Sequence, residues 1–293
     1  MVSVCHDSTI KLWNLQNFTF IHAIQTKTNG VNCLALSQNN DFCIAGSYDA
    51  TLRVYDLNTY LESAVLRGHE SIIICIEITQ NDELAISGSE DTTIRIWNLK
   101  KYSQQDIFKG HTGPIRGISI LSHYIISVSE DCTVRIWNSF EKTSEYIFKD
   151  HKNVVLCICV SDNKELAASG SGDKTIIVWD LSKYTKKTQL SGHSNAVCGV
   201  RFSRCGNFIV SVSIDKSMWV WKNCVAQHSI LFTYSSKLIS VFITKDDRLA
   251  IVSAEDCTVH IWDWREKRRI AVMSGLLSIK DEIIQIPELS SLF

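Results

Sequence analysis

Residues 87–98 read Ser87-Gly88-Ser89-Glu90-Asp91-Thr92-Thr93-Ile94-Arg95-Ile96-Trp97-Asn98, and this stretch decides the fold. It predicts the end of one strand, a tight turn at Asp91 and a second strand ending on Trp97, because Gly and Asp favour turns while β-branched and aromatic residues favour strands. The same step of 6 residues from an Asp to an aromatic residue recurs at Asp7–Trp13, Asp49–Tyr55, Asp131–Trp137, Asp173–Trp179, Asp215–Trp221 and Asp256–Trp262. Successive Asp residues are 40 to 42 apart, and a fixed period of this length indicates a repeat architecture.

Each repeat predicts four short strands. In the clearest repeat these are Ile72–Ile78, Leu84–Ser89, Thr93–Trp97 and Tyr102–Phe108, with polar turn residues between them. Short strands at regular spacing are typical of antiparallel all-β structure. The chain has only 2 Pro residues, so the predicted strands are not interrupted.

The recurring pattern of Gly-His followed by Ser-x-x-Asp-x-Thr-hydrophobic-x-hydrophobic-Trp-Asn/Asp resembles the WD40 repeat. Seven copies in register make this resemblance specific, although Lys222 replaces the final Asp or Asn in one of them. The resemblance implies an all-β fold, a seven-bladed β-propeller of four-stranded antiparallel blades, in a single domain over residues 1–293.

The count of predicted strands explains how such a ring would close. Six complete blades are expected at about 31–66, 72–108, 115–148, 154–190, 197–232 and 238–273. The N-terminus supplies three strands, and Ile283–Ile286 supplies one, so residues 278–293 plus 1–26 form the closing blade. We expect Ile283–Ile286 to be the innermost strand of this blade, beside Val2–Cys5, because this pairing covers edges that would otherwise stay open. An alternative is that the chain is the propeller fragment of a larger multidomain protein.

Composition excludes several classes of protein. The formal net charge of -1 offers no global positive field for nucleic acid. No apolar run approaches the length of a membrane helix, and the N-terminus lacks the features of a signal peptide. The 11 Cys residues include no Cys-x-x-Cys pair. These features predict an intracellular protein with free thiols, in the cytoplasm or the nucleus, with no nucleic-acid or membrane partner.

Ser, His and Asp recur together, which raises the hypothesis of a hydrolytic triad. The resemblance instead implies a structural tetrad, in which a Trp indole donates to Ser, Ser to His, and His to Asp. An enzyme needs one active site rather than a copy in each of four blades, so we expect no catalytic residues. The expected tetrads are Ser87, His69, Asp91 and Trp97; Ser127, His111, Asp131 and Trp137; Ser169, His151, Asp173 and Trp179; and Ser211, His193, Asp215 and Trp221.

Cysteine could suggest a metal site, above all Cys157 and Cys159 near His151. Alignment of the repeats argues against this, because Cys33, Cys75 and Cys157 share one strand position that is small in other repeats. Free Cys behaves as a small hydrophobic residue. We therefore expect no metal, and no motif predicts a cofactor.

The resemblance implies a non-catalytic scaffold that binds a protein or peptide partner on the propeller face. The alternative is a substrate-receptor or modified-peptide reader subunit of a ubiquitin ligase or chromatin complex. Two positions in each blade should line the binding face, one early in the first strand and one before the turn Asp. The predicted partner-binding residues are Tyr48, Ile74, Glu90, Arg116, Glu130, Leu156, Ile214, Ile239 and Glu255.

These residues combine large apolar groups with charge, which is the makeup of a recognition site. The alternative is that the Ile and Leu side chains only plug the channel. The residues Glu90, Glu130 and Glu255 favour a partner that carries Lys or Arg. Such a scaffold is expected to be a subunit of a larger complex.

Overall fold

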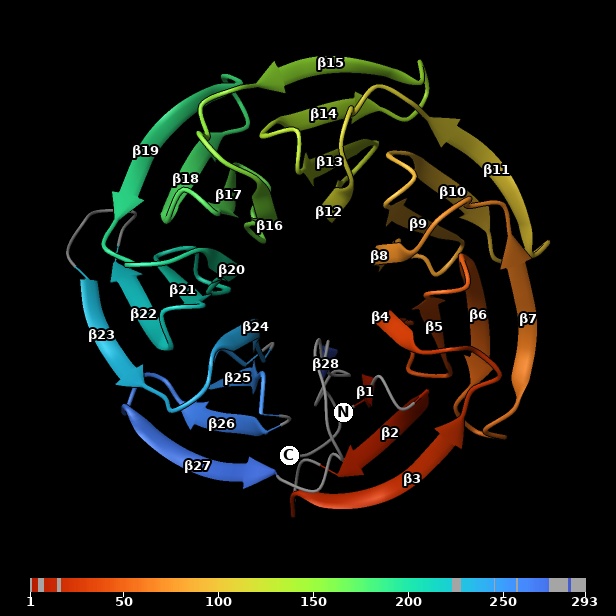
Figure 1. Cartoon of the computed structure of the whole chain (residues 1–293), viewed down its shortest axis with the longest axis horizontal. Helices are drawn as coiled ribbons and strands as arrows, with labels where there is room; N and C mark the ends of the chain where they lie inside the picture. Colours follow the sequence, from red (N-terminus) through yellow and green to blue (C-terminus); the bar gives the residue numbers. More distant parts are fainter. Residues whose placement is uncertain are drawn as a thin grey trace. The chain divides into compact units, whose positions relative to one another are not determined.

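The computed structural model describes residues 2–4, 8–14, 17–222, 228–244, 246–256, 258–273 and 284–285. Within these ranges every regular element is a β-strand, and the strands form seven four-stranded sheets (Figure 1). The fold is a seven-bladed β-propeller of antiparallel four-stranded blades, which confirms the predicted fold class. The described residues fall into two compact units, one with strands β1–β11 and β28 and the other with strands β12–β27.

The first unit contains three sheets, in the orders β28-β1-β2-β3, β4-β5-β6-β7 and β8-β9-β10-β11. Their strands are β28 (Ile284–Gln285), β1 (Val2–Val4), β2 (Thr9–Asn14) and β3 (Thr19–Gln25); β4 (Val31–Leu36), β5 (Phe42–Ser47), β6 (Thr51–Asp56) and β7 (Glu62–Arg67); and β8 (Ile73–Ile78), β9 (Leu84–Ser89), β10 (Ile94–Asn98) and β11 (Ser103–Phe108).

The closing sheet joins the two ends of the chain. Strand β28 pairs antiparallel with β1, with Val2 opposite Gln285 and Ser3 opposite Ile284. This confirms the predicted pairing of a C-terminal strand with the first N-terminal strand. Of the two segments predicted to pair, Cys5, Ile283 and Ile286 lie outside the described residues.

The second unit contains four sheets, each with its strands in chain order. Their strands are β12 (Ile115–Leu121), β13 (Tyr124–Ser129), β14 (Val134–Asn138) and β15 (Thr143–Phe148); β16 (Val155–Val160), β17 (Leu166–Ser171), β18 (Thr175–Asp180) and β19 (Thr185–Ser191); β20 (Val197–Phe202), β21 (Phe208–Ser213), β22 (Ser217–Lys222) and β23 (His228–Thr233); and β24 (Leu238–Ile243), β25 (Leu249–Ala254), β26 (Val259–Asp263) and β27 (Arg268–Met273).

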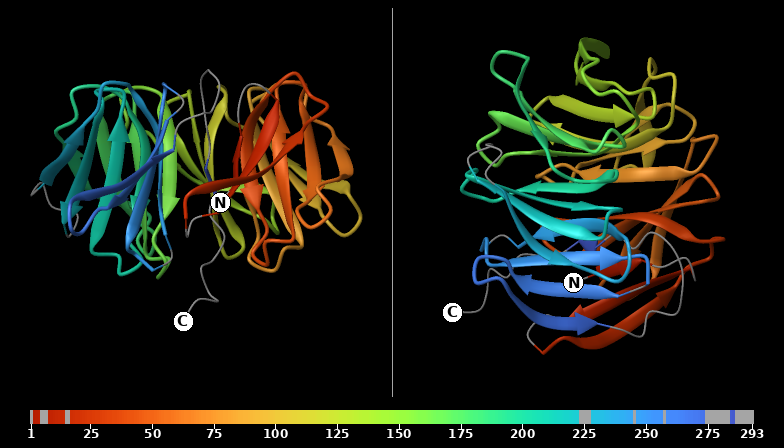
Figure 2. Two further views of the ribbon diagram at one scale, coloured as in Figure 1. Left: turned by 90° about the horizontal axis from the view of Figure 1, so that it is seen from below. Right: turned by 60° about the vertical axis from the view of Figure 1, so that its left-hand side comes forward.

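Burial follows the position of a strand within its sheet. The second strands, such as β9 and β17, are buried at every residue but the first. The outermost strands, such as β15, alternate between exposed and half-buried residues. Within each sheet the strands lie side by side with a progressive twist (Figure 2). Central strands are therefore buried almost throughout, including their Ser residues, because neighbouring sheets cover both of their faces.

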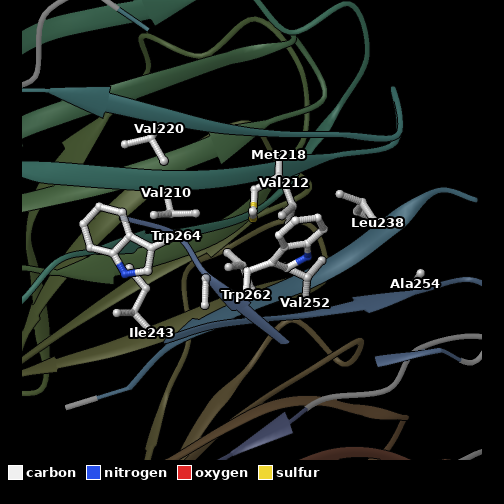
Figure 3. Packing of buried hydrophobic residues seen from close by; sticks show 12 residues of the cluster. Val210, Val212, Met218, Val220, Leu238, Ile243, Val252, Ala254, Trp262 and Trp264 are labelled. Atoms are coloured by element: carbon white, nitrogen blue, oxygen red, sulfur yellow. The ribbon is translucent and has the colours of Figure 1, made fainter. Parts of the chain in front are cut away.

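The packing between the last two sheets shows how one sheet covers the next. Trp262 and Trp264 of the β24–β27 sheet lie among Val210, Val212 and Met218 of the β20–β23 sheet (Figure 3). All five side chains are buried. This cluster shows that the repeated aromatic residue at the end of each third strand is a core residue.

Candidate functional site

A chain of hydrogen bonds links four side chains in the β8–β11 sheet. Trp97 Nε1 donates to Ser87 Oγ over 2.8 Å, Ser87 Oγ lies 2.7 Å from His69 Nε2, and His69 Nδ1 lies 2.7 Å from Asp91 Oδ2. A neutral imidazole with its proton on Nδ1 satisfies all three bonds. Asp91 also accepts bonds from the Thr93 and Glu70 backbone N–H groups. The network thus ties the β9–β10 turn and the loop before β8 to the centre of the sheet.

Two sheets of the second unit repeat this network. In the order of indole to Ser, Ser to His and His to Asp, the distances are 2.9, 2.8 and 2.9 Å for Trp179, Ser169, His151 and Asp173. They are 2.8, 2.8 and 2.9 Å for Trp221, Ser211, His193 and Asp215. In the β12–β15 sheet, Trp137 donates to Ser127 over 2.7 Å, and Asp131 accepts from the Thr133 N–H and hydroxyl. His111, of the first unit, is buried.

The accessibility of these serines decides what they can do chemically. Ser87, Ser169 and Ser211 are fully buried, and each hydroxyl oxygen already accepts the proton of an indole. A nucleophile must reach its substrate with a lone pair free. The arrangement therefore supports turn anchoring at these three serines and not acyl transfer.

The carboxylates of the network are stabilised in their charged form. Burial raises the pKa of Asp91, but hydrogen bonds from His69, Thr93 and the Glu70 N–H outweigh this and hold the pKa well below its usual range. Asp173 has the same balance of burial against bonds from His151, Thr175 and the Lys152 N–H. Because the charged form is favoured, these groups contribute to folding stability at neutral pH.

Two sheets depart from the network. In the β4–β7 sheet Ala45 stands at the Ser position, and the buried Tyr55 hydroxyl has no hydrogen-bond partner among the described residues. There Asp49 is held instead by Arg53, which also pairs with Glu62 over 2.7 Å. In the β24–β27 sheet, Val252 stands at the Ser position. The buried indole N–H of Trp262 therefore lacks the Ser acceptor that the Trp has in the other sheets.

The aligned cysteines pack against glycines of the neighbouring strand. Cys33, Cys75 and Cys157 lie opposite Gly46, Gly88 and Gly170, respectively. A Cβ on Gly170 would lie 2.7 Å from Cys157 Sγ and 2.8 Å from Val197 Cγ1, so the sulfur and the Val197 side chain together fill the space that the glycine leaves. Where the first strand carries Gly199 instead, Val212 lies opposite. Burial raises the pKa of the Cys33 and Cys157 thiols, and no cluster of three metal-binding side chains occurs among the described residues.

The first of the two predicted partner-binding positions coincides with a β-bulge. The register shifts between Ile73 and Cys75, between Val155 and Cys157, and between Leu238 and Ser240. The extra residues at these bulges are Ile74, Leu156 and Ile239. A bulge leaves its extra residue out of the ladder and re-aims its side chain. The sequence contains no signal for these bulges, which only the strand pairing shows.

The second position lies close to the first. The N–H of Glu90 donates to Ile72 O over 3.0 Å, that of Ile214 to Ala196 O over 3.0 Å, and that of Glu255 to Lys237 O over 2.9 Å. Tyr48 makes the corresponding bond to Gly30 O over 3.3 Å. These bonds place the residue before the turn Asp beside the start of the first strand of the same sheet. We call this end of a sheet its entry end; in the β16–β19 sheet it comprises residues 149–154 and 172–174.

Exposure separates the predicted partner-binding residues. Ile74 is buried, with 9% of its surface exposed, which fits a packing role. The others are partly exposed: Tyr48, Glu90, Arg116, Glu130, Leu156, Ile214, Ile239 and Glu255. In the first unit the candidates are Tyr48, Ile74 and Glu90, and in the second unit they are the remaining six.

Two of the three predicted acidic residues already have a cation partner. Arg116 Nε donates to Glu130 Oε1 over 2.8 Å, and Lys237 Nζ lies 3.1 Å from Glu255 Oε1. Glu90 accepts a bond from Ser71 Oγ over 3.1 Å, and among the described residues no cation pairs with it. The negative charge expected on this set is therefore partly neutralised within the chain itself.

Comparison with known families identifies the chain. A sequence profile described as WD domain, G-beta repeat matches residues 18–56, 61–98, 102–138, 142–180, 184–222 and 227–263. These segments span more than half of the chain, and the chain belongs to the WD40 family. Each matched segment starts at the outermost strand of one sheet and ends with the third strand of the next, as residues 18–56 hold β3 to β6.

Members of this family are generally protein-interaction scaffolds and are typically non-catalytic. A search of curated proteins found no match to the chain. The described part of the chain contains no helix with the length and apolar character that a membrane span requires.

Proposed function

We propose that the protein is a non-catalytic scaffold that binds a protein or peptide partner at the entry ends of its sheets. The supporting observation is the placement of partly exposed apolar residues at β-bulges, beside turn residues that carry charge. Leu156 and Ile239 occupy bulges, and Ile214 lies in the β21–β22 turn. Apolar anchors next to a few polar groups are characteristic of binding sites.

The rigidity of the turns at the entry ends also supports this surface as the binding site. The turn Asp residues are each held by several hydrogen bonds, as Asp173 is by the His151 side chain and the Lys152 N–H. Loops that are held in place lose little conformational entropy when a partner binds, which favours affinity. Glu90 still supports a preference for Lys or Arg in the partner, because no cation among the described residues pairs with it.

We also infer that the protein works in a reducing compartment, the cytoplasm or the nucleus, as a subunit of a larger complex. The support is that all 8 cysteines within the described residues are free thiols, which is typical of reducing compartments.

The experiment is affinity capture with the full chain as bait, followed by mass spectrometry. The variant Glu90→Lys with Glu130→Lys changes one entry-end charge in each unit, and we expect it to fold normally and to lose the bound partner. The control Glu83→Lys with Glu141→Lys makes the same charge change in turns at the opposite ends of the sheets. Retention of every captured protein by the first variant would contradict the proposed surface.

A further inference from the structure

Three exposed lysines gather at the entry ends of two neighbouring sheets in the second unit. Lys152 precedes β16, Lys174 lies in the β17–β18 turn and Lys216 in the β21–β22 turn. All three are exposed, and among the described residues none of their amino groups takes part in an ion pair or hydrogen bond. Three ammonium groups are therefore available to an anionic partner.

The hydrogen bonds locate these lysines relative to one another. The Lys152 N–H donates to Asp173 Oδ2 over 2.9 Å, so Lys152 and Lys174 flank the same carboxylate. Lys216 follows Asp215, the corresponding residue of the next sheet. The β16–β19 and β20–β23 sheets are neighbours (Figure 1). They share one apolar core, which includes Cys159, Ala168 and Val197. The lysines therefore belong to one continuous part of the second unit.

The backbone does not require lysine at these turns. Lys174 and Lys216 have positive φ angles of 71° and 68°. The same turn position holds Ala50, Thr92 and Cys132 in other sheets, at φ angles of 62°, 67° and 66°. The conformation is common to the turn whatever its side chain, so local structure does not explain the two lysines.

The nearby carboxylates Asp173 and Asp215 form no ion pair with the three lysines among the described residues. Asp173 accepts bonds from His151, Thr175 and the Lys152 N–H, and Asp215 from His193, Ser217 and the Ser194 N–H. Both carboxylates keep their negative charge, but their oxygens are already bonded to donors of their own turns. The remaining acidic candidates of this unit, Glu130 and Glu255, pair with Arg116 and Lys237.

An apolar surface lies beside the lysines. Leu156 at the β16 bulge and Ile214 in the β21–β22 turn are both partly exposed. The β8–β11 sheet of the first unit differs, since there Glu70 holds the position of Lys152 and Glu90 that of Gly172. Binding to a charged lipid or RNA backbone would not need the apolar residues, whereas a peptide would use both.

From these observations we propose that the second unit binds an acidic segment of a partner protein. Asp or Glu residues of that segment pair with Lys152, Lys174 and Lys216, and an apolar residue of it packs on Leu156 and Ile214. This inference rests on the proposed function and specifies the partner chemistry at one part of it. For the second unit, this inference replaces the basic partner that Glu130 and Glu255 predict with an acidic one.

The test uses a random peptide library displayed on phage and selected on the intact protein. We expect enrichment of peptides with Asp or Glu next to a large apolar residue. The synthetic form of an enriched peptide should lose about tenfold or more in affinity when Lys152, Lys174 and Lys216 are all changed to Glu, and binding should weaken as salt rises.

The matched control changes Lys164, Lys183 and Lys187 to Glu, three exposed lysines of the same unit in other turns and strands. It alters the net charge by the same amount, and we expect it to bind the peptide nearly as well as the unchanged protein. Equal losses in both variants would show a general charge effect and overturn the proposal.

The remaining outcomes separate this proposal from the proposed function. Enriched peptides that are basic or neutral overturn the acidic-segment proposal and leave the scaffold function in place. If neither the library nor affinity capture yields any binder, both fail. A poly-uridine RNA or vesicles of anionic phospholipid that bind as tightly as the peptide, with the same dependence on the three lysines, would also overturn it.

Discussion

Replacement of Asp91 by alanine tests the idea that the Trp-Ser-His-Asp network anchors the turns. The change removes the acceptor for His69 Nδ1, for the Thr93 N–H and hydroxyl, and for the Glu70 N–H. The His69 side chain is completely buried, so its Nδ1–H loses its main partner at a cost of about 1–3 kcal/mol. Glu70 is exposed, so water replaces the carboxylate at its N–H at a cost of roughly 0.5 kcal/mol. Thr93 is buried, so the loss of its acceptor costs roughly 0.5 to 1 kcal/mol. We expect the free energy of unfolding to fall by about 2–4 kcal/mol.

The matched control is Asp256→Ala, at the same turn position of the β24–β27 sheet. Asp256 is exposed and accepts bonds only from Thr258 among the contacts that the structure describes. Its replacement should cost less than about 1 kcal/mol. Urea unfolding at neutral pH, followed by circular dichroism and tryptophan fluorescence, measures both changes. If Asp91→Ala costs no more than Asp256→Ala, the buried His69 contact is not the source of turn stability and the reasoning fails.

Two further predictions follow from the same contacts. Folding lowers the pKa values of Asp91 and Asp173, so their contribution to stability is complete above the unfolded pKa of about 3.9 and is lost as the pH falls toward the folded values. The urea midpoint should therefore drop below about pH 4, and it should drop less steeply in Asp91→Ala than in the unchanged protein. Equal slopes in the two proteins would contradict this linkage. Gly170→Val should destabilise the protein by about 1–3 kcal/mol through overpacking against Cys157 and Val197. Adding Cys157→Gly should recover the part that is due to Cys157, about 1 kcal/mol, because the pair then reproduces Gly199 opposite Val212; a double-mutant cycle without coupling would show that residues 157 and 170 do not share the space.

The sequence by itself determined the architecture and the composition of the turns. The spacing from Asp91 to Trp97, repeated along the chain, was enough to predict four strands in each repeat, and the repeats in register predicted seven sheets. The leftover strands at both ends predicted the pairing that β28 makes with β1. These features follow from local preferences, namely alternation, β-branching and turn residues, which a repeat averages over many copies.

Only the tertiary structure decided how side chains far apart in the chain meet. The bulges that take Ile74, Leu156 and Ile239 out of the ladder depend on strand register, which leaves no mark in a single strand. The pairing of Arg116 with Glu130 links strand β12 to the β13–β14 turn, 14 positions along the chain, and it changes the charge that the sequence alone assigned to this surface. Electrostatic character depends on which charges come within a few ångströms of one another, and that is set by packing rather than by composition.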